Sequence, residues 1–525
     1  MNGRVIAAVS AVWAASAFPA LTAEPLSAIP WLSQSIDISA APPPARPDAT
    51  DPVSGPSPGA ASGSDTITVT SLDGIRRDAT GLLPPSDSGF ARDLWGPTRA
   101  SEATSLILAH RPRAAPDARA LFHRLLLAEA DAPPGSDGDA ALLIARIDRL
   151  LGMGALEEAS ALLDISDPNT PDLFRRWFDT GLLLGRAEPP CEALRQNPSL
   201  SPTLPARVFC LARGGDWNAA EITLTLGEGV GSIPPDQERL LARFLDPDLF
   251  EGEPDPAIPD PLTPLDFLLR EAVGLPRPSG ALPLAFLHAD LDVHAPMRVR
   301  IDAAERLILA DAVDPPVLFE AYRAGEPAAS GGAWDRAAAV QNLDAALDAG
   351  DPAGIGAALM AADRALSARG LRVAFAADAA RRLAMLDPGS LSAAARATAF
   401  ELLLLADDPD VARLFTDPAD PRSGALLAIA GAGNAPLDGH DDLTRAALEG
   451  LQTRDPGDTR EVRLRVTLDS GRQGAALIEA LDLLPARGPA DPAAFRAALH
   501  ILNAAGQIET ARRIALQTLL LPDGT

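Results

Sequence analysis

The chain has 525 residues, of which 47% are apolar and only 4% aromatic, and its formal net charge is −26. This length allows two domains or one extended repeat array, while the strong negative charge argues against nucleic acid as a partner, because phosphate neutralisation needs clustered cations. Every basic residue is an arginine, which excludes chemistry based on a Schiff-base lysine or a phosphate-binding P-loop lysine.

An export signal is predicted at residues 1–23. Arg4 supplies a short positive region, residues 5–18 are apolar and uncharged, and small residues follow up to Ala23, directly before the first acidic residue. Cleavage is expected after Ala23, with Ala17 as the alternative. We therefore expect a periplasmic protein. The alternatives are secretion, or anchoring by an uncleaved N-terminal segment that is just long enough for a thin bilayer.

Residues 24–65 are predicted to form a disordered linker, because most of this segment is rich in Pro, Ala, Ser, Gly and Asp. The linker contains one apolar island, Ile29-Pro30-Trp31-Leu32. The sequence leaves two interpretations of this island open: a short docking segment, or simply a sticky part of the linker.

An extended arm is predicted at residues 66–100. Its start, Thr66 to Thr70, alternates β-branched residues and is typical of one short strand. Near its end, Leu94 and Trp95 are expected to be buried against the helical body. No partner strand is evident elsewhere in the chain.

From Ser101 onward the apolar residues recur at helical spacing. A Pro-rich segment at 251–264 divides the helical region into a first part, 101–250, and a second part, 265–525, because it holds five prolines and no helical pattern. The sequence therefore predicts an all-α fold, and no segment after the signal is long and apolar enough to span a membrane.

One local pattern recurs in this helical region. A leucine-containing helix end is followed by a small turn residue and then by a helix with alanines on its packing face. It predicts helical hairpins, because glycine just past a helix end accepts the left-handed backbone conformation and alanines allow close helix approach. The five copies begin at Leu150, Leu211, Leu347, Leu468 and Leu502.

This pattern resembles the broad class of tetratricopeptide-like helical-repeat proteins. The glycines of the last two copies, Gly471 and Gly506, are 35 residues apart, close to one repeat of that class, although its Trp, Tyr and Pro anchors are absent. The resemblance covers residues 101–520 and implies an irregular α-solenoid. Residues 303–307 and 328–336 also resemble exported bacterial proteins of this build, which implies no known activity.

Two cysteines, Cys191 and Cys210, are predicted to form a disulfide. Prolines open a short helix at Cys191, a loop follows, and Pro205 starts the helix that carries Cys210. An antiparallel hairpin would bring the two residues level, and an oxidising compartment favours the bond. The alternative is a pair of buried free thiols.

Two clusters of histidine and aspartate have the residue types of a metal site. The segment His288 to His294 would place its polar residues on one face only as a strand, whereas helices are expected on both sides of it. Asp438 to Asp442 precedes a predicted helix and is typical of a helix cap. We therefore assign no metal, cofactor-binding or catalytic residues.

The function predicted from the sequence is a non-catalytic periplasmic scaffold or protein-binding module, for example in envelope assembly. Repeat arrays present long surfaces to peptide and protein partners. The alternative is a cell-envelope hydrolase similar to the lytic transglycosylases, with acid residues not yet recognised. In those enzymes the catalytic glutamate is followed by serine, a dipeptide that this chain lacks.

Overall fold

In the described part of the chain, a computed structural model shows an all-helical protein, as predicted, with no β-strand. An isolated parallel bridge joins Leu83 to Ala128. The described residues are 29–32, 77–112, 115–136, 138–278, 282–417, 420–452, 457–484 and 490–521. The predicted signal peptide, most of the predicted linker and the predicted strand at Thr66 to Thr70 lie outside these ranges.

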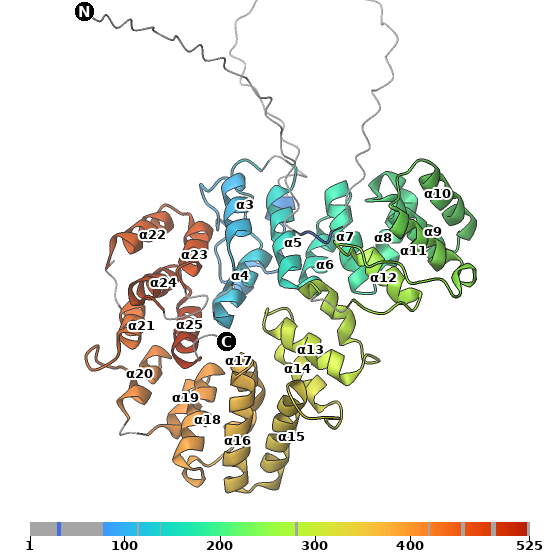
Figure 1. The fold of residues 1–525 in the computed structure, drawn as a ribbon. Coiled ribbons are helices and arrows are strands. Elements are labelled where there is room, and N and C mark those ends of the chain that lie inside the picture. Colours follow the sequence, from blue (N-terminus) through green and yellow to red (C-terminus); the bar gives the residue numbers. More distant parts are fainter. Residues whose placement is uncertain are drawn as a thin grey trace, which may run out of the picture.

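Figure 1 shows the order and arrangement of the helices. Those before the Pro-rich segment are α2 (Pro85–Ser88), α3 (Ala100–Ala109), α4 (Pro116–Leu127), α5 (Ala141–Met153), α6 (Leu156–Ile165), α7 (Pro171–Leu183), α8 (Glu188–Gln196), η1 (Pro198–Leu200), α9 (Leu204–Arg213), α10 (Trp217–Gly229), α11 (Pro235–Leu245) and η2 (Pro247–Phe250).

Those after the Pro-rich segment are α12 (Pro264–Ala272), η3 (Leu284–Leu291), α13 (Met297–Ile308), α14 (Pro315–Arg323), α15 (Ala333–Ala349), α16 (Pro352–Ser367), α17 (Arg372–Leu383), η4 (Pro388–Ser390), α18 (Ala393–Leu405), α19 (Pro409–Ala412), η5 (Arg413–Phe415), α20 (Pro421–Ile429), α21 (Asp442–Gln452), α22 (Thr459–Asp469), α23 (Gln473–Leu481), α24 (Pro492–Ala504) and α25 (Ile508–Leu520). No helix in the described ranges is long and apolar enough to cross a membrane.

Proline and aspartate start many of these helices. Proline suits the first helical position, where its missing N–H has no helical partner to lose. Aspartate just before it accepts hydrogen bonds from the free N–H groups of the first turn. Asp351 and Asp420 do this for α16 and α20. The excess of acidic residues is therefore partly explained by helix capping.

The five predicted hairpins are confirmed. In each copy a glycine of positive φ lies between two helices that pack against each other. At the first, Gly154 ends α5 with φ of 83° and its N–H donates to the carbonyls of the last turn, which is the left-handed helix end that the sequence predicts. The five helix pairs are α5 and α6, α9 and α10, α15 and α16, α22 and α23, and α24 and α25.

The chain turns back so that its last helices lie against its first ones (Figure 1). Helix α25 packs against α4, and α23 packs against both α3 and α4. Asp117 at the start of α4 accepts a hydrogen bond from Nε of Arg513 at 2.7 Å, and its backbone N–H donates to Gln517 at 2.9 Å. The first and last helices are thereby joined directly.

The predicted arm contributes to this closure. Its described part, from residue 77, is not continuously extended, since it contains α2 and several turns. Leu94 and Trp95 are buried, as expected. The carbonyl of Leu94 accepts a hydrogen bond from the N–H of Gly474 at 2.8 Å, which attaches the arm to the start of α23.

Regular helix is absent from residues 251–263, within the predicted linker. The packing nevertheless continues across this segment, because α12 contacts both α7 and α11. Leu265 and Leu269 of α12 belong to the same apolar cluster as Phe174 and Phe209. The division into two parts at residues 251–264 stays a prediction, and the core of the first part includes α12.

Candidate functional site

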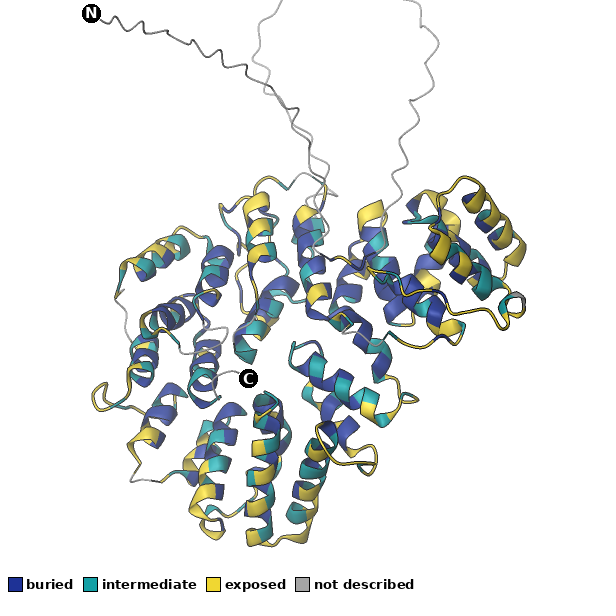
Figure 2. Cartoon of the chain, viewed as in Figure 1, coloured by how far each residue is buried: buried dark blue, intermediate teal, exposed yellow. Residues whose placement is uncertain are grey.

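Much of helix α10 is exposed (Figure 2), and its exposed residues include large apolar ones. Ile222 and Leu226 of α10, and Val230 directly after its last residue, are four residues apart, and they are 60%, 65% and 76% exposed. Residues at this spacing lie on one side of a helix. We call these three residues the α10 stripe. Contiguous exposed apolar side chains on a helix are typical of an interaction surface.

A second apolar face of α10 explains its position in the fold. Ala220, Leu224 and Gly227 are buried, where α10 packs against α9 and α11. A Cβ atom on Gly227 would lie 2.6 Å from Cδ1 of Ile233, so this face is closely packed. A helix that is apolar on two faces is normally covered on both, whereas here one face is exposed.

The charged side chains of α10 are negative. Helix α10 contains two acidic residues, Glu221 and Glu228, and no basic residue. Both glutamates are exposed, and Asp216 caps the helix by accepting a hydrogen bond from the N–H of Ala219 at 3.2 Å. A partner surface of positive charge would be complementary to α10.

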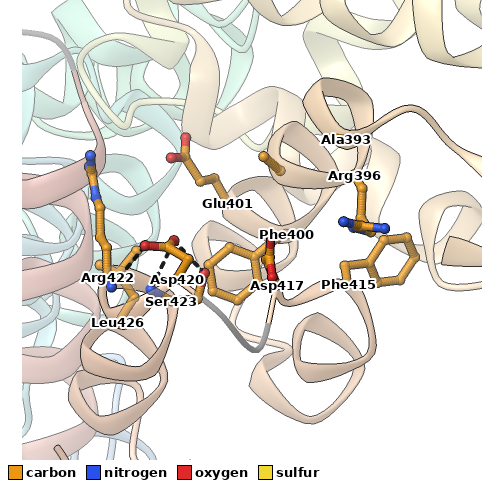
Figure 3. Close-up of a pocket in the computed structure, with 11 residues that line it drawn as sticks. Ala393, Arg396, Phe400, Glu401, Phe415, Asp417, Asp420, Arg422, Ser423 and Leu426 are labelled. Atoms are coloured by element: carbon orange, nitrogen blue, oxygen red, sulfur yellow. Dashed lines mark hydrogen bonds between the residues drawn. The ribbon is translucent and has the colours of Figure 1, made fainter. Parts of the chain in front are cut away.

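A pocket of about 300 Å³ lies between α18, η5 and α20. Its apolar side chains include the buried Phe400, Phe415 and Leu426. Figure 3 shows Arg396 close to Phe415, and Arg422 on the opposite side of Phe400. The other polar side chains that line it are Glu401, Asp417, Asp420 and Ser423.

Two carboxylates of this pocket are engaged in the fold. Asp420 accepts hydrogen bonds from the Ser423 hydroxyl at 2.8 Å and from the N–H of Arg422 at 3.1 Å. The Ser423 hydroxyl is the main reason that the pKa of Asp420 lies below its ordinary value. Glu401 accepts from Nη2 of Arg372 at 2.8 Å. The pocket is also lined by Arg396 and Arg422, whose guanidinium groups suit an anionic group.

The histidines of the segment His288 to His294 point to separate partners. Nε2 of His288 lies 2.6 Å from the carbonyl oxygen of Gly154, and burial lowers the pKa of His288. Nδ1 of exposed His294 contacts Asp292 at 2.9 Å. Within the described ranges, no three His, Cys, Asp or Glu side chains are grouped so as to hold a metal ion.

The predicted helix cap in the segment Asp438 to Asp442 is confirmed. Asp441 accepts hydrogen bonds from the N–H groups of Leu443 and Thr444 at 3.1 and 2.9 Å. It also accepts from the Thr444 hydroxyl at 2.7 Å. This carboxylate therefore caps the start of α21.

A buried histidine–glutamate pair was not predicted. Nδ1 of His500 in α24 contacts Oε1 of Glu461 in α22, and Nη2 of Arg496 lies 3.1 Å from Oε2 of Glu461. The side chains of Glu461 and His500 are both buried. These residues are 39 positions apart, so only the packing of α22 on α24 brings them together. Because solvent does not reach the pair, we interpret it as structural.

A second unpredicted pair lies between α4 and α6. Burial lowers the pKa of His123, and the charge of Glu158 opposes this shift. Nε2 of His123 and Oε2 of Glu158 are both buried, and neither atom has a hydrogen-bond partner among the described residues. A neutral imidazole is therefore favoured at this position.

Comparisons with known proteins identify no relative. No protein-family model matches the chain, no curated protein matches it significantly, and neither does any solved structure. The functional interpretation therefore rests on the surfaces described above.

The two cysteines lie next to each other on a helical hairpin, as the sequence predicts. Cys191 is carried by α8 and Cys210 by α9, and these helices pack against each other. Both residues are buried, their Cα atoms are 5.1 Å apart, and the two sulfur atoms are at disulfide distance. This Cα separation is within the usual range for a disulfide.

We predict that the denatured, unreduced protein has no thiol that reacts with a maleimide probe, and that reduction exposes two. Closing a loop of this size stabilises a protein by about 3 kcal/mol in the chain-entropy model. Replacing both cysteines with serine should therefore lower the free energy of unfolding by about that amount. Reductant should have no effect on the double variant. Two reactive thiols before reduction would contradict the disulfide.

Proposed function

We propose that this chain is an exported, non-catalytic helical scaffold that binds a protein partner through the α10 stripe. The exposed positions of Ile222, Leu226 and Val230 are the observation that carries this proposal. Leaving three large apolar side chains exposed to water costs free energy compared with burying them. A partner that covers them recovers that free energy.

The partner that fits this surface is a helix with an apolar face. Side chains at positions i, i+4 and i+8 present a straight row that packs well against a second helix. A second copy of this chain is disfavoured, because both copies would carry a formal charge of −26. A partner with basic residues complements the negative charge of this chain.

The proposed location is the periplasm. The predicted signal peptide supports export, and the Cys191–Cys210 pair at disulfide distance suits an oxidising compartment. The repeated hairpins support a tetratricopeptide-like array as the framework of the scaffold. Separating periplasmic, membrane and culture fractions tests the location, and recovery from the cytoplasm alone would overturn it.

A photo-crosslinking amino acid at position 226 tests the binding function in the native cells. We expect a discrete crosslinked adduct at this position. The same amino acid at position 228 is the matched control, because Glu228 is exposed on the same helix but lies away from the stripe. Absence of an adduct at 226, or equal adducts at both positions, would overturn the proposal.

A further inference from the structure

The island Ile29 to Leu32 is docked on the helical body. Ile29, Trp31 and Leu32 are only 4%, 6% and 4% exposed, and all three belong to the main apolar cluster. A segment of four residues cannot bury three large side chains by itself, so the body supplies a groove that holds them. The sequence left a docking segment and a sticky linker as alternatives, and this burial supports the docking segment.

Aromatic side chains define one side of this groove. The indole of Trp31 meets the ring of Phe286 edge to face, with ring centroids 5.6 Å apart. Phe286 meets Phe267 in the same way at 5.3 Å, and the guanidinium of Arg277 lies 5.5 Å from the centre of the Phe267 ring. Edge-to-face contacts fix the orientation of the rings, so the groove holds an aromatic side chain in one orientation.

The elements around the groove hold it in place. Phe286 lies on η3, which packs against α5, α7 and α13. Phe267 lies on α12, which packs against α7 and α11. The groove thus depends on the framework of helices and not on the docked segment alone.

The docked segment has the form of a tight turn. The N–H of Leu32 donates to the carbonyl of Ile29 at 3.3 Å, with Pro30 at the second position, where its fixed φ suits a turn. Pro30 is exposed, while the other three side chains are buried. The recognised shape is therefore compact, and a loop of another protein could present it equally well.

We propose that this groove is an exchangeable peptide-binding site, plugged by residues 29–32 and opened when a partner peptide with the same isoleucine, tryptophan and leucine displaces them. This inference rests on the proposed function, in which the body binds a partner, and adds a second surface to it. The plug is joined to the body through residues 33–76. Binding of the plug is therefore intramolecular, and at an effective concentration of about 1 mM the plug competes strongly with a free peptide.

The test uses a fluorescent peptide with the sequence of residues 24–38. Its binding by anisotropy is compared between the chain that starts at Glu24 and the same chain with Trp31→Ala. With a groove affinity of about 10 µM, the plugged chain should bind about 100-fold more weakly than the variant. A second variant, Ile29→Ser with Leu32→Ser, should bind the peptide as Trp31→Ala does. Circular dichroism shows which of the two variants retains the fold, and binding is judged on a folded variant.

Two controls complete the experiment. Trp217→Ala removes a half-exposed tryptophan elsewhere and should bind as weakly as the unaltered chain. A peptide with alanine in place of its tryptophan should not bind any variant. The proposed peptide-binding site would be overturned if a folded, unplugged variant failed to bind the peptide. Equal binding by plugged and unplugged chains would also overturn it. Crosslinking at position 226 does not depend on this result, so the two proposals can fail separately.

Discussion

Replacing Gly96 with alanine should destabilise the protein by about 3 kcal/mol, through strain and overpacking at the closure between the arm and α23. A Cβ atom on Gly96 would lie 2.1 Å from the carbonyl oxygen of Gly471, and the φ of Gly96 is 46°. The neighbouring atoms are backbone, so they cannot move aside as a flexible side chain would. Urea denaturation measures the change in the free energy of unfolding.

Gly135→Ala is the matched control for this prediction. Gly135 also has a positive φ, of 87°, but a Cβ atom added there would meet no atom within 4 Å beyond its chain neighbours. Gly135→Ala should therefore be destabilised by only about 1 kcal/mol, the cost of placing alanine in the left-handed conformation. Hydrogen exchange should also accelerate in residues 77–99 of Gly96→Ala and not in the control. Equal destabilisation by both substitutions would contradict the close contact between the arm and the hairpin of α22 and α23.

Replacing Glu305 with alanine should destabilise the protein by about 3–5 kcal/mol. The side chain of Glu305 is buried in α13 and accepts from the Tyr322 hydroxyl at 2.9 Å, from Arg336 at 2.8 and 2.7 Å, and from Arg369 at 3.1 Å. The pKa of Tyr322 is raised mainly by burial and secondly by the charge of Glu305. Without the carboxylate, donors from three segments lose the buried acceptor that they share. Urea denaturation again measures the loss.

Asp302→Ala, one turn earlier in α13, is the control for Glu305. Asp302 pairs with Arg298 at 2.8 Å, but both side chains are about half exposed, and such pairs contribute less than about 1 kcal/mol. Glu305→Gln keeps one acceptor and should fall between the two. If Glu305→Ala were as stable as Asp302→Ala, the carboxylate would not hold α13, α14 and α15 together.

The local elements of this fold could be predicted because short signals specify them. A leucine run, a glycine and an alanine-bearing helix specify a hairpin within a short stretch of sequence, as at Gly154 and Gly350, where both glycines have positive φ. The cap at Asp441 and the level positions of Cys191 and Cys210 follow from equally local rules.

The long-range features could not be predicted, because no local rule specifies them. The contact of Asp117 with Gln517 spans 400 positions, and the pair of Glu461 with His500 depends on two helices that are separate in sequence. The exposure of the α10 stripe could not be predicted either, because apolar residues on both sides of a helix normally indicate full burial. Only the packing shows which of the two faces is covered.

Replacing the α10 stripe with glutamine tests the central claim most directly. The variant Ile222→Gln, Leu226→Gln and Val230→Gln keeps good helix propensity, and all three positions are exposed. We predict that its free energy of unfolding stays within about 1 kcal/mol of the unaltered chain, while the adduct formed by a crosslinker at the neighbouring position 229 disappears. An undiminished adduct, or a large loss of stability, would show that the stripe serves the fold and not a partner.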